Sequence, residues 1–134
     1  LVSEPLTWLH TYPKTEKAWI LALKSYSNVT PATASNVADL FRKSLETLFQ
    51  EFFNSQKSLE NYKGEYKDYL ISHGIPTEIS SNLSITLNQY TAFINHHAKH
   101  HDSTDEKALE YIMYETGNIM RLLLTLKQQE ITTV

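Results

Sequence analysis

The stretch VADLFRKSLETLFQEF, residues 37–52, decides the fold of this chain. Its apolar residues recur at steps of three and four, which is the spacing of one face of an α-helix. They are Val37, Leu40, Phe41, Leu45, Leu48, Phe49 and Phe52. Ser35 or Asn36 has the short polar side chain that caps a helix N-terminus. The stretch therefore predicts a long amphipathic helix with one buried face.

On the N-terminal side of this stretch, a first helix is predicted to begin after Pro13, with Thr15 as its cap, and to end near Tyr26. Its apolar face consists of Ala18, Trp19, Leu21, Ala22 and Leu23. Residues 27–35 contain Pro31 and short polar side chains, a composition that is typical of a loop. We expect the first two helices to form an antiparallel hairpin.

On the C-terminal side, the apolar pattern continues through residues 59–70, either as a third helix or as the same helix bent near residue 54. His73-Gly74 would end that segment, since glycine suits the left-handed position that follows a helix. A further helix opens at Pro76 or Thr77 and leads to Asn95. Its predicted apolar stripe contains Ile79, Leu83, Ile85, Leu87, Tyr90, Phe93 and Ile94.

Ser103-Thr104-Asp105-Glu106 has the serine and glutamate spacing of a capping box, which predicts the start of the last helix. The apolar residues of that helix are Leu109, Ile112, Met113, Ile119, Met120, Leu123 and Leu124. We expect its tail to fray after Gln128. The sequence thus predicts an all-α fold, a bundle of four or five helices in antiparallel hairpins. Residues 1–134 would form one domain, with 1–13 and 128–134 at its periphery.

Composition limits the classes of function. The chain has 134 residues, of which 41% are hydrophobic and 20% charged, as in an ordinary globular domain. It has no cysteine, which excludes disulfides and a cysteine nucleophile, and its net charge of −3 is not that of a general nucleic-acid binder. No apolar run reaches the ~18 residues of a membrane span, and no signal peptide is visible. We therefore expect a cytoplasmic protein without membrane contact, and the first residue, Leu1, suggests a domain cut from a longer protein that has further domains.

The chemistry is concentrated in Asn95-His96-His97-Ala98-Lys99-His100-His101-Asp102, a run that contains four of the six histidines. At about 100° per residue, His97 and His101 continue the apolar stripe of the helix. Asn95 and Lys99 lie on its polar side, and His100 lies at the flank of the stripe. Helical geometry therefore separates a core-facing pair from four candidate site residues, which are Asn95, His96, Lys99 and His100.

Three interpretations of this run stay open. In the first, histidines spaced four apart chelate zinc with Asp102 or Glu106, although the run has no H-E-x-x-H pattern. In the second, His100 acts as a base towards a ribose 2′-hydroxyl, Lys99 stabilises the phosphate and Asn95 forms a hydrogen bond, so that RNA is cleaved without a metal. In the third, the histidines form a polar helix end that interacts with the helix dipole and faces solvent or a partner. The second and third need no metal or cofactor, and we expect neither.

Two arginines have simpler structural interpretations. Arg42 and Glu46 are four residues apart on the second helix, which predicts a surface ion pair. Arg121 lies within an apolar stretch, and we expect it to pair with Glu115 or with a partner chain.

Four short stretches resemble the HEPN superfamily, in particular its abortive-infection C-terminal type, which occurs in bacterial antiphage and toxin proteins. They are Leu40–Leu48, with its arginine and Leu-Glu pair; Ser58–Asn61; Asn95–Asp102, which is similar to the Asn-x-x-x-Lys-His form of the family signature; and Tyr114–Gly117. The likeness extends from Pro13 to Leu126, nearly the whole chain.

This resemblance implies a helical bundle that forms a homodimer and acts on RNA, in many members as a metal-independent ribonuclease. His100 takes the position of the catalytic histidine, with Lys99 as the phosphate contact and Asn95 and His96 as orienting residues. Asn95 stands where an arginine is usual, so Lys99 or Arg42 would have to supply the missing charge. If neither does, the resemblance implies a catalytically degenerate bundle that serves to dimerise or assemble a larger protein.

Overall fold

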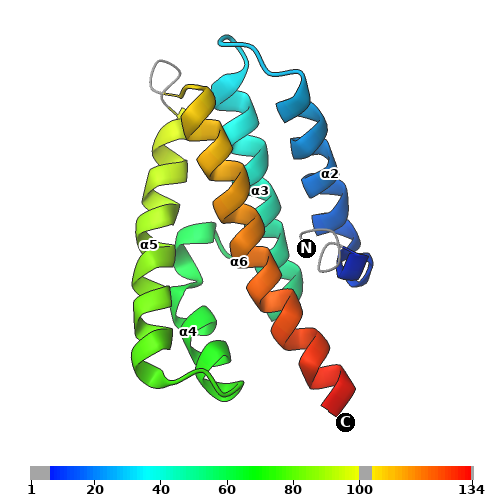
Figure 1. The fold of residues 1–134 in the computed structure, drawn as a ribbon, viewed down its shortest axis with the longest axis vertical. Coiled ribbons are helices and arrows are strands. Elements are labelled where there is room, and N and C mark those ends of the chain that lie inside the picture. Colours follow the sequence, from blue (N-terminus) through cyan, green and yellow to red (C-terminus); the bar gives the residue numbers. More distant parts are fainter. Residues whose placement is uncertain (1–6, 100–103, 134) are drawn as a thin grey trace.

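The computed structural model describes residues 7–99 and 104–133, and in these ranges every regular element is a helix. The elements are η1 (Trp8–Thr11), α2 (Pro13–Ser27), α3 (Ala34–Phe53), η2 (Leu59–Asn61), α4 (Lys63–Ser72), α5 (Thr77–Lys99) and α6 (Glu106–Thr133). The four long helices alternate in direction along the chain, and the short helix α4 lies beside the first half of α5 (Figure 1). The predicted all-α bundle of antiparallel hairpins is therefore confirmed.

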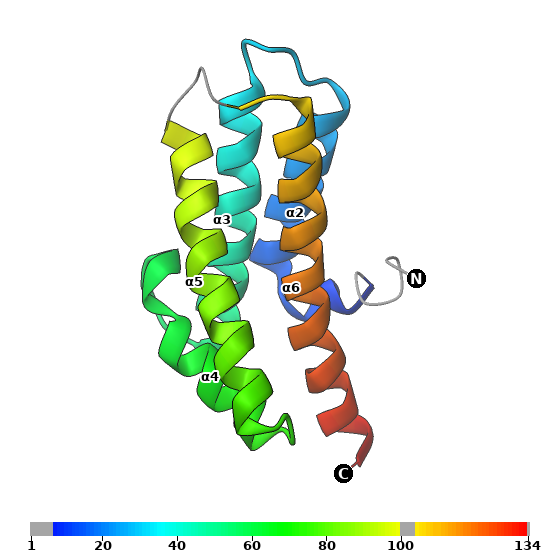
Figure 2. The ribbon, with the colours of Figure 1, turned by 60° about the vertical axis from the view of Figure 1, so that its left-hand side comes forward.

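Helix α3 is the centre of the bundle, because it packs against α2, α5 and α6 (Figure 2). The face predicted from residues 37–52 is buried, with Phe41, Leu45, Leu48 and Phe49 all at 0% exposure. The Phe49 ring meets that of Tyr62 at a centroid distance of 5.3 Å, which extends the core into the segment after α3. Burying large aromatic and aliphatic side chains from every helix supplies most of the driving force for this fold.

The side chains of Leu9 and Tyr12 join the core, at 1% and 8% exposure, whereas those of His10 and Thr11 are exposed. The first helix departs from the prediction in two ways. Helix α2 begins at Pro13, which places Thr15 inside the helix and not at its cap. Leu21 is 51% exposed and lies outside the apolar face. The cap was predicted wrongly from local sequence because a distant side chain accepts the hydrogen bonds of the free N–H groups at this helix N-terminus.

That side chain is Glu51, near the end of α3. Its Oε1 accepts hydrogen bonds from the backbone N–H and the hydroxyl of Thr15, both at 2.7 Å, and its Oε2 accepts one from the N–H of Lys14 at 3.4 Å. A carboxylate at a helix N-terminus is also favoured by the helix dipole. The cap of α2 is therefore supplied from α3, and it ties the two helices together.

Helix α3 begins at Ala34, so the prediction of Ser35 or Asn36 as its cap is wrong. The Ser35 hydroxyl instead donates to the carbonyl oxygen of Ala98 at 3.4 Å and joins the start of α3 to the end of α5. Helix α3 ends at Phe53, where Asn54 adopts a left-handed φ of 52°. The apolar segment after it thus forms separate helices, η2 and α4, and not a bent continuation of α3.

The end of α4 matches the prediction from His73-Gly74. Gly74 has a φ of 88°, and its N–H donates to the carbonyl oxygen of Ile71 at 3.2 Å. The N–H of Ile75 donates to the carbonyl oxygen of Leu70 at 3.0 Å. These two bonds form the Schellman motif that a left-handed glycine permits.

The buried face of α5 is rotated from the predicted stripe in its first half. Ile79 and Ile85 are each 50% exposed, whereas Ser80 and Ser84 are buried at 0% and 1%. The two serine hydroxyls donate to the carbonyl oxygens of Ile75 and Lys63, which is how buried polar groups are normally satisfied. Small serines fit here because α4 packs closely against this part of α5.

Helix α6 differs from the prediction at both ends. It begins at Glu106, and Asp105 caps it by accepting a hydrogen bond from the N–H of Ala108 at 2.8 Å. Ser103, the predicted first residue of the capping box, lies outside the described residues. The helix continues to Thr133 instead of fraying after Gln128. Glu130 helps to hold this end, since its Oε2 lies 2.9 Å from His73 Nε2.

Candidate functional site

The last turn of α5 carries three of the four candidate site residues, Asn95, His96 and Lys99. Asn95 is half-buried, and His96 and Lys99 are exposed. Asn95 and Lys99 are four residues apart and therefore share one face of the helix. The fourth candidate, His100, lies outside the described residues, as do His101, Asp102 and Ser103. The described part of the site is thus a short polar surface at one end of the bundle.

His97 lies between these residues in sequence but faces the core, as the helical stripe predicted. It is 8% exposed, and its ring lies against that of Phe93 at a centroid distance of 4.4 Å. Its Nδ1 lies 3.1 Å from the Thr104 hydroxyl oxygen, and that hydroxyl donates to the His97 carbonyl oxygen at 2.9 Å. Because the hydroxyl proton is used on the carbonyl, the ring is best satisfied with its proton on Nδ1.

This pair of hydrogen bonds anchors the end of α5 to the start of α6. Burial lowers the pKa of His97 below its ordinary value of 6.5, and the nearby His96 lowers it further, while Asp105 partly opposes the shift. His97 is therefore neutral at neutral pH. Its role in the fold is to fix the turn that carries the exposed candidates, and its Nδ1 is committed to Thr104.

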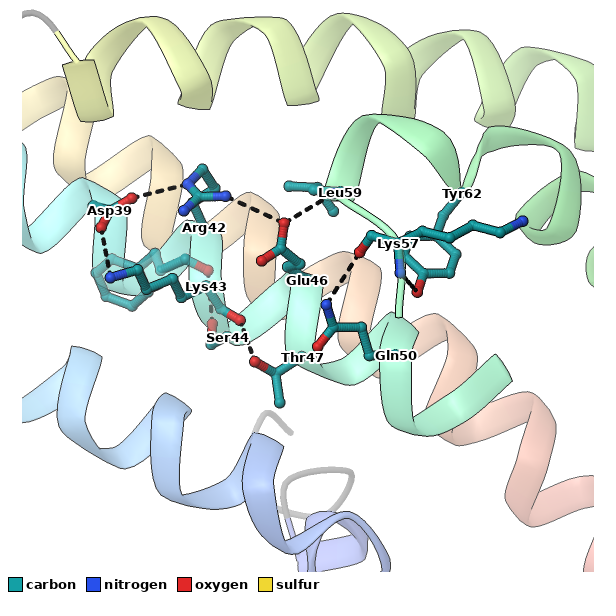
Figure 3. Close-up of polar contacts among 11 residues, drawn as sticks. Asp39, Arg42, Lys43, Ser44, Glu46, Thr47, Gln50, Lys57, Leu59 and Tyr62 are labelled. Carbon is teal, nitrogen blue, oxygen red and sulfur yellow. Dashed lines mark hydrogen bonds and ion pairs between the residues drawn. The ribbon is translucent and has the colours of Figure 1, made fainter. Parts of the chain in front are cut away.

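A second polar cluster lies on α3 and contains Asp39, Arg42, Lys43 and Glu46 (Figure 3). Arg42 Nε lies 2.9 Å from Asp39 Oδ1, and Arg42 Nη1 lies 3.3 Å from Glu46 Oε2. Lys43 Nζ lies 3.1 Å from Asp39 Oδ2. The Arg42 and Glu46 side chains are only 20% and 22% exposed, so the predicted ion pair is present but largely buried. We call these four residues the α3 charge cluster.

The α3 charge cluster also organises the chain after α3. Oε2 of Glu46 accepts a hydrogen bond from the N–H of Leu59 at 3.0 Å, which satisfies the first residue of η2 (Figure 3). Burial alone would raise the pKa of Asp39, but hydrogen bonds from Arg42 and Lys43 outweigh it and hold the pKa below 3.8. Asp39 is therefore ionised at neutral pH, and its negative charge lies beside the Arg42 guanidinium.

Arg42 and Glu46 of the α3 charge cluster lie on the side of α3 that faces α5 (Figure 3). Because Ser35 bonds to Ala98 and the two helices are antiparallel, Asp39 and Arg42 follow one and two turns further from that junction. Arg42 is thus on the correct side of α3 to approach the α5 surface. However, its charge is held by Asp39 and Glu46. Within the described residues Lys99 has no ion pair, which makes it the cation available at this end of α5.

The zinc interpretation of the histidine run gains no support from the described residues. Over residues 7–99 and 104–133, no group of three or more His, Cys, Asp or Glu side chains could hold a metal ion. Each histidine pair spaced four apart includes one residue, His100 or His101, outside these ranges. A zinc site that uses His100 or His101 therefore stays a prediction.

Arg121 does not form the predicted ion pair with Glu115. It is exposed on α6, and the ion pairs of the described residues do not include it. It lies instead at a cavity of about 190 Å³ between α2 and α6, which Trp19 and Gly117 also line. The sequence shows no sign of this cavity, because its two walls are about a hundred residues apart.

Comparison of the chain with known protein families, curated proteins and solved structures gives no match. In the part of the chain that the structure describes, none of the helices combines the length and apolarity needed to cross a membrane. Two features of the α3 charge cluster were not predicted from the sequence, namely the part of Asp39 and the bond to Leu59. Asp39 could have been found by its spacing of three and four to Arg42 and Lys43, whereas the bond from Glu46 to Leu59 has no local signal.

Proposed function

We propose that this chain is a HEPN-like domain that acts on RNA as a homodimer, within a bacterial antiphage-defence or toxin system. The observation that supports it is the last turn of α5, where an exposed cation, Lys99, lies three residues after an exposed imidazole, His96. The half-buried amide of Asn95 shares the face of Lys99. The buried His97–Thr104 anchor holds this turn against α6.

The proposed chemistry is acid–base cleavage without a metal. His100 takes the proton of a ribose 2′-hydroxyl, and the oxygen attacks the adjacent phosphate. The negative charge that develops on the phosphate is stabilised by the Lys99 ammonium, while Asn95 and His96 orient the nucleotide by hydrogen bonds. The bond from phosphorus to the 5′-oxygen breaks, and His100 returns its proton to that oxygen, so the products are a 2′,3′-cyclic phosphate and a free 5′-hydroxyl. A single lysine replaces the bidentate grip of an arginine only in part, so we expect a slow enzyme.

The test is incubation of purified protein with labelled single-stranded RNA in EDTA. We expect cleavage that EDTA does not suppress, that His100→Ala abolishes and that Lys99→Gln reduces by roughly tenfold or more. Lys107→Gln is the matched control, because Lys107 is an exposed lysine near the start of α6. Intact RNA at high wild-type concentration, or activity unchanged in His100→Ala, contradicts the catalytic proposal.

A second candidate is a degenerate HEPN-like bundle that dimerises or assembles a longer parent protein. The observation that favours it is the α3 charge cluster. Arg42 forms ion pairs with Asp39 and Glu46, so it does not supply the positive charge of the arginine that usually stands at position 95. Ile20 and Leu21, which are 44% and 51% exposed on α2, offer apolar surface to a partner. This candidate predicts a dimer in sedimentation equilibrium that His100→Ala leaves intact. A monomer contradicts both proposals.

A further inference from the structure

A cavity of about 190 Å³ separates α2 from α6 on one side of the bundle. The two helices both run beside α3 without packing closely on each other (Figures 1 and 2). Its walls include Trp19 and Leu23 from α2 and Met113, Tyr114, Gly117 and Arg121 from α6. These α6 residues are spaced three and four apart, so they share one helix face. The lining is mostly apolar, and it also includes the charged residue Arg121 and the amide residue Asn118.

One residue that lines this cavity, Trp19, carries an unsatisfied hydrogen-bond donor. Trp19 is 4% exposed, and its Nε1 is buried with no hydrogen-bond partner among the described residues. Buried side-chain polar atoms nearly always have a partner, so such a group needs an explanation. The indole edge that faces Gly117 carries Cη2 and Cζ2, and Nε1 belongs to the same edge of the ring. The orphan N–H thus belongs to a residue of the cavity wall, next to the ring atoms that face Gly117.

Gly117 leaves space for about one methyl group against Trp19. A Cβ at this position would lie 3.6 Å from Trp19 Cη2 and 3.8 Å from Cζ2, which is ordinary van der Waals contact. Its backbone has no positive φ, so neither conformation nor crowding requires glycine here. Glycine is nevertheless unfavourable in the interior of a helix. Its presence costs helix stability and leaves empty space beside an unsatisfied donor, which is the pattern expected of a site built for a ligand.

We propose that this cavity binds a small apolar carboxylate. The carboxylate accepts the hydrogen bond of the Trp19 N–H and is neutralised by Arg121, and the apolar body fills the space beside Gly117 and Leu23. An apolar cavity of about 150 Å³ holds a benzene ring, so this one holds an aromatic acid of roughly ten non-hydrogen atoms. Since Nε1 has almost no accessible surface, the side chains that cover it must shift on binding. The site is separate from the α5 surface and does not depend on action on RNA.

The test is a titration of the ¹⁵N-labelled protein with phenylacetate, followed by the two indole N–H cross-peaks of Trp8 and Trp19. We expect a saturable shift of the Trp19 peak, with a dissociation constant of about 1 mM or tighter, and little change at Trp8. Phenylacetamide, which has the same shape without the charge, should bind at least about fivefold more weakly because Arg121 prefers an anion.

Two variants with matched controls make the test decisive. Gly117→Ala adds a methyl group inside the cavity, whereas Gly64→Ala adds one to open space on α4, with no atom within 4 Å. We expect Gly117→Ala alone to weaken binding by about tenfold or more. Arg121→Gln should remove the preference for acid over amide, and Lys107→Gln should not.

Three results overturn the proposal. They are a Trp19 peak that does not move at about 10 mM phenylacetate, equal binding of acid and amide by the wild type, and equal weakening by Gly117→Ala and Gly64→Ala. Circular dichroism of each variant checks that the fold is retained. If a variant at position 117 does not fold, Arg121→Gln still decides the question, because Arg121 is exposed.

Discussion

The hydroxyl of Tyr90 joins α5 to α6 in the interior of the bundle, and its removal should lower the free energy of unfolding by about 1–2 kcal/mol. Tyr90 is 2% exposed, and its hydroxyl donates to the carbonyl oxygen of Ile112 at 2.9 Å. The same oxygen lies 2.6 Å from the hydroxyl of Thr116, which is 0% exposed. Because the tyrosine proton is used on Ile112, the Thr116 hydroxyl donates to Tyr90.

The magnitude follows from what Tyr90→Phe leaves behind. The ring stays, so its apolar burial is unchanged, and two buried neutral hydrogen bonds worth about 0.5–1.5 kcal/mol each are lost. Thr116 lies four residues after Ile112 on the same helix, so its hydroxyl can rotate and donate to the carbonyl oxygen that Tyr90 releases. This local replacement recovers part of one bond and places the net loss at about 1–2 kcal/mol, below the ~3 kcal/mol of two full losses.

The assay is urea unfolding of wild type, Tyr90→Phe, Thr116→Val and the double variant. We expect Thr116→Val to cost about 0.5–1.5 kcal/mol and the pair to show a coupling energy of about 1 kcal/mol. Tyr111→Phe is the control, since Tyr111 is 47% exposed, and it should stay within about 0.5 kcal/mol of wild type. Additive effects of the two buried substitutions, or a Tyr90→Phe variant as stable as wild type, would refute this account of the α5–α6 junction.

Three further perturbations test other junctions. Glu51→Ala should lower the free energy of unfolding by about 2–4 kcal/mol in urea melts, because it removes the cap of α2 and leaves the buried Thr15 hydroxyl without its acceptor; Glu51→Gln should lose less. Unfolding melts between pH 7.5 and 5 should show stability falling as pH drops from the ordinary 6.5 through the lower folded pKa of His97, and His97→Gln should remove this component of the slope. A hydrogen bond from His73 holds the pKa of the Glu130 carboxylate below 4.5, so the last turns of α6 should lose amide-exchange protection as pH falls through that lower pKa, and Glu130→Gln should remove this dependence.

The helices were predictable because each long one has a strong local period. Residues 37–52 show it best, since Phe41, Leu45 and Phe49 recur at one face and are all fully buried. The stop at Gly74 was equally local, because a left-handed residue after a helix strongly favours glycine. The predictions that failed depend on distant partners. The sequence around Thr15 contains no signal that Glu51, thirty-six residues later, caps this helix.

The prediction of the buried face in the first half of α5 was wrong for a related reason. A hydrophobic pattern assumes that apolar side chains are buried and serines are exposed, but Ser80 and Ser84 are buried and Ile79 is half exposed. The helix is rotated by its contact with α4, where small side chains allow close approach and backbone carbonyls accept the hydroxyl protons. In the candidate site, the burial of His97 was predictable from the same stripe, but its partner Thr104 was not.

The two candidate functions require different behaviour of Arg42 in the α3 charge cluster. If the domain cleaves RNA, a cation must reach the phosphate, and Arg42 could do so only by leaving both Asp39 and Glu46. That movement would uncover two largely buried carboxylates and release the N–H of Leu59, whose acceptor is the same Glu46 oxygen. Breaking one partner of a buried ion pair typically costs several kcal/mol. Binding of one phosphate at a surface offers no comparable return, so Arg42 is better explained as a fixed support of η2. Under the RNA-cleavage proposal, the catalytic charge would then have to come from Lys99 or from a second copy of the chain.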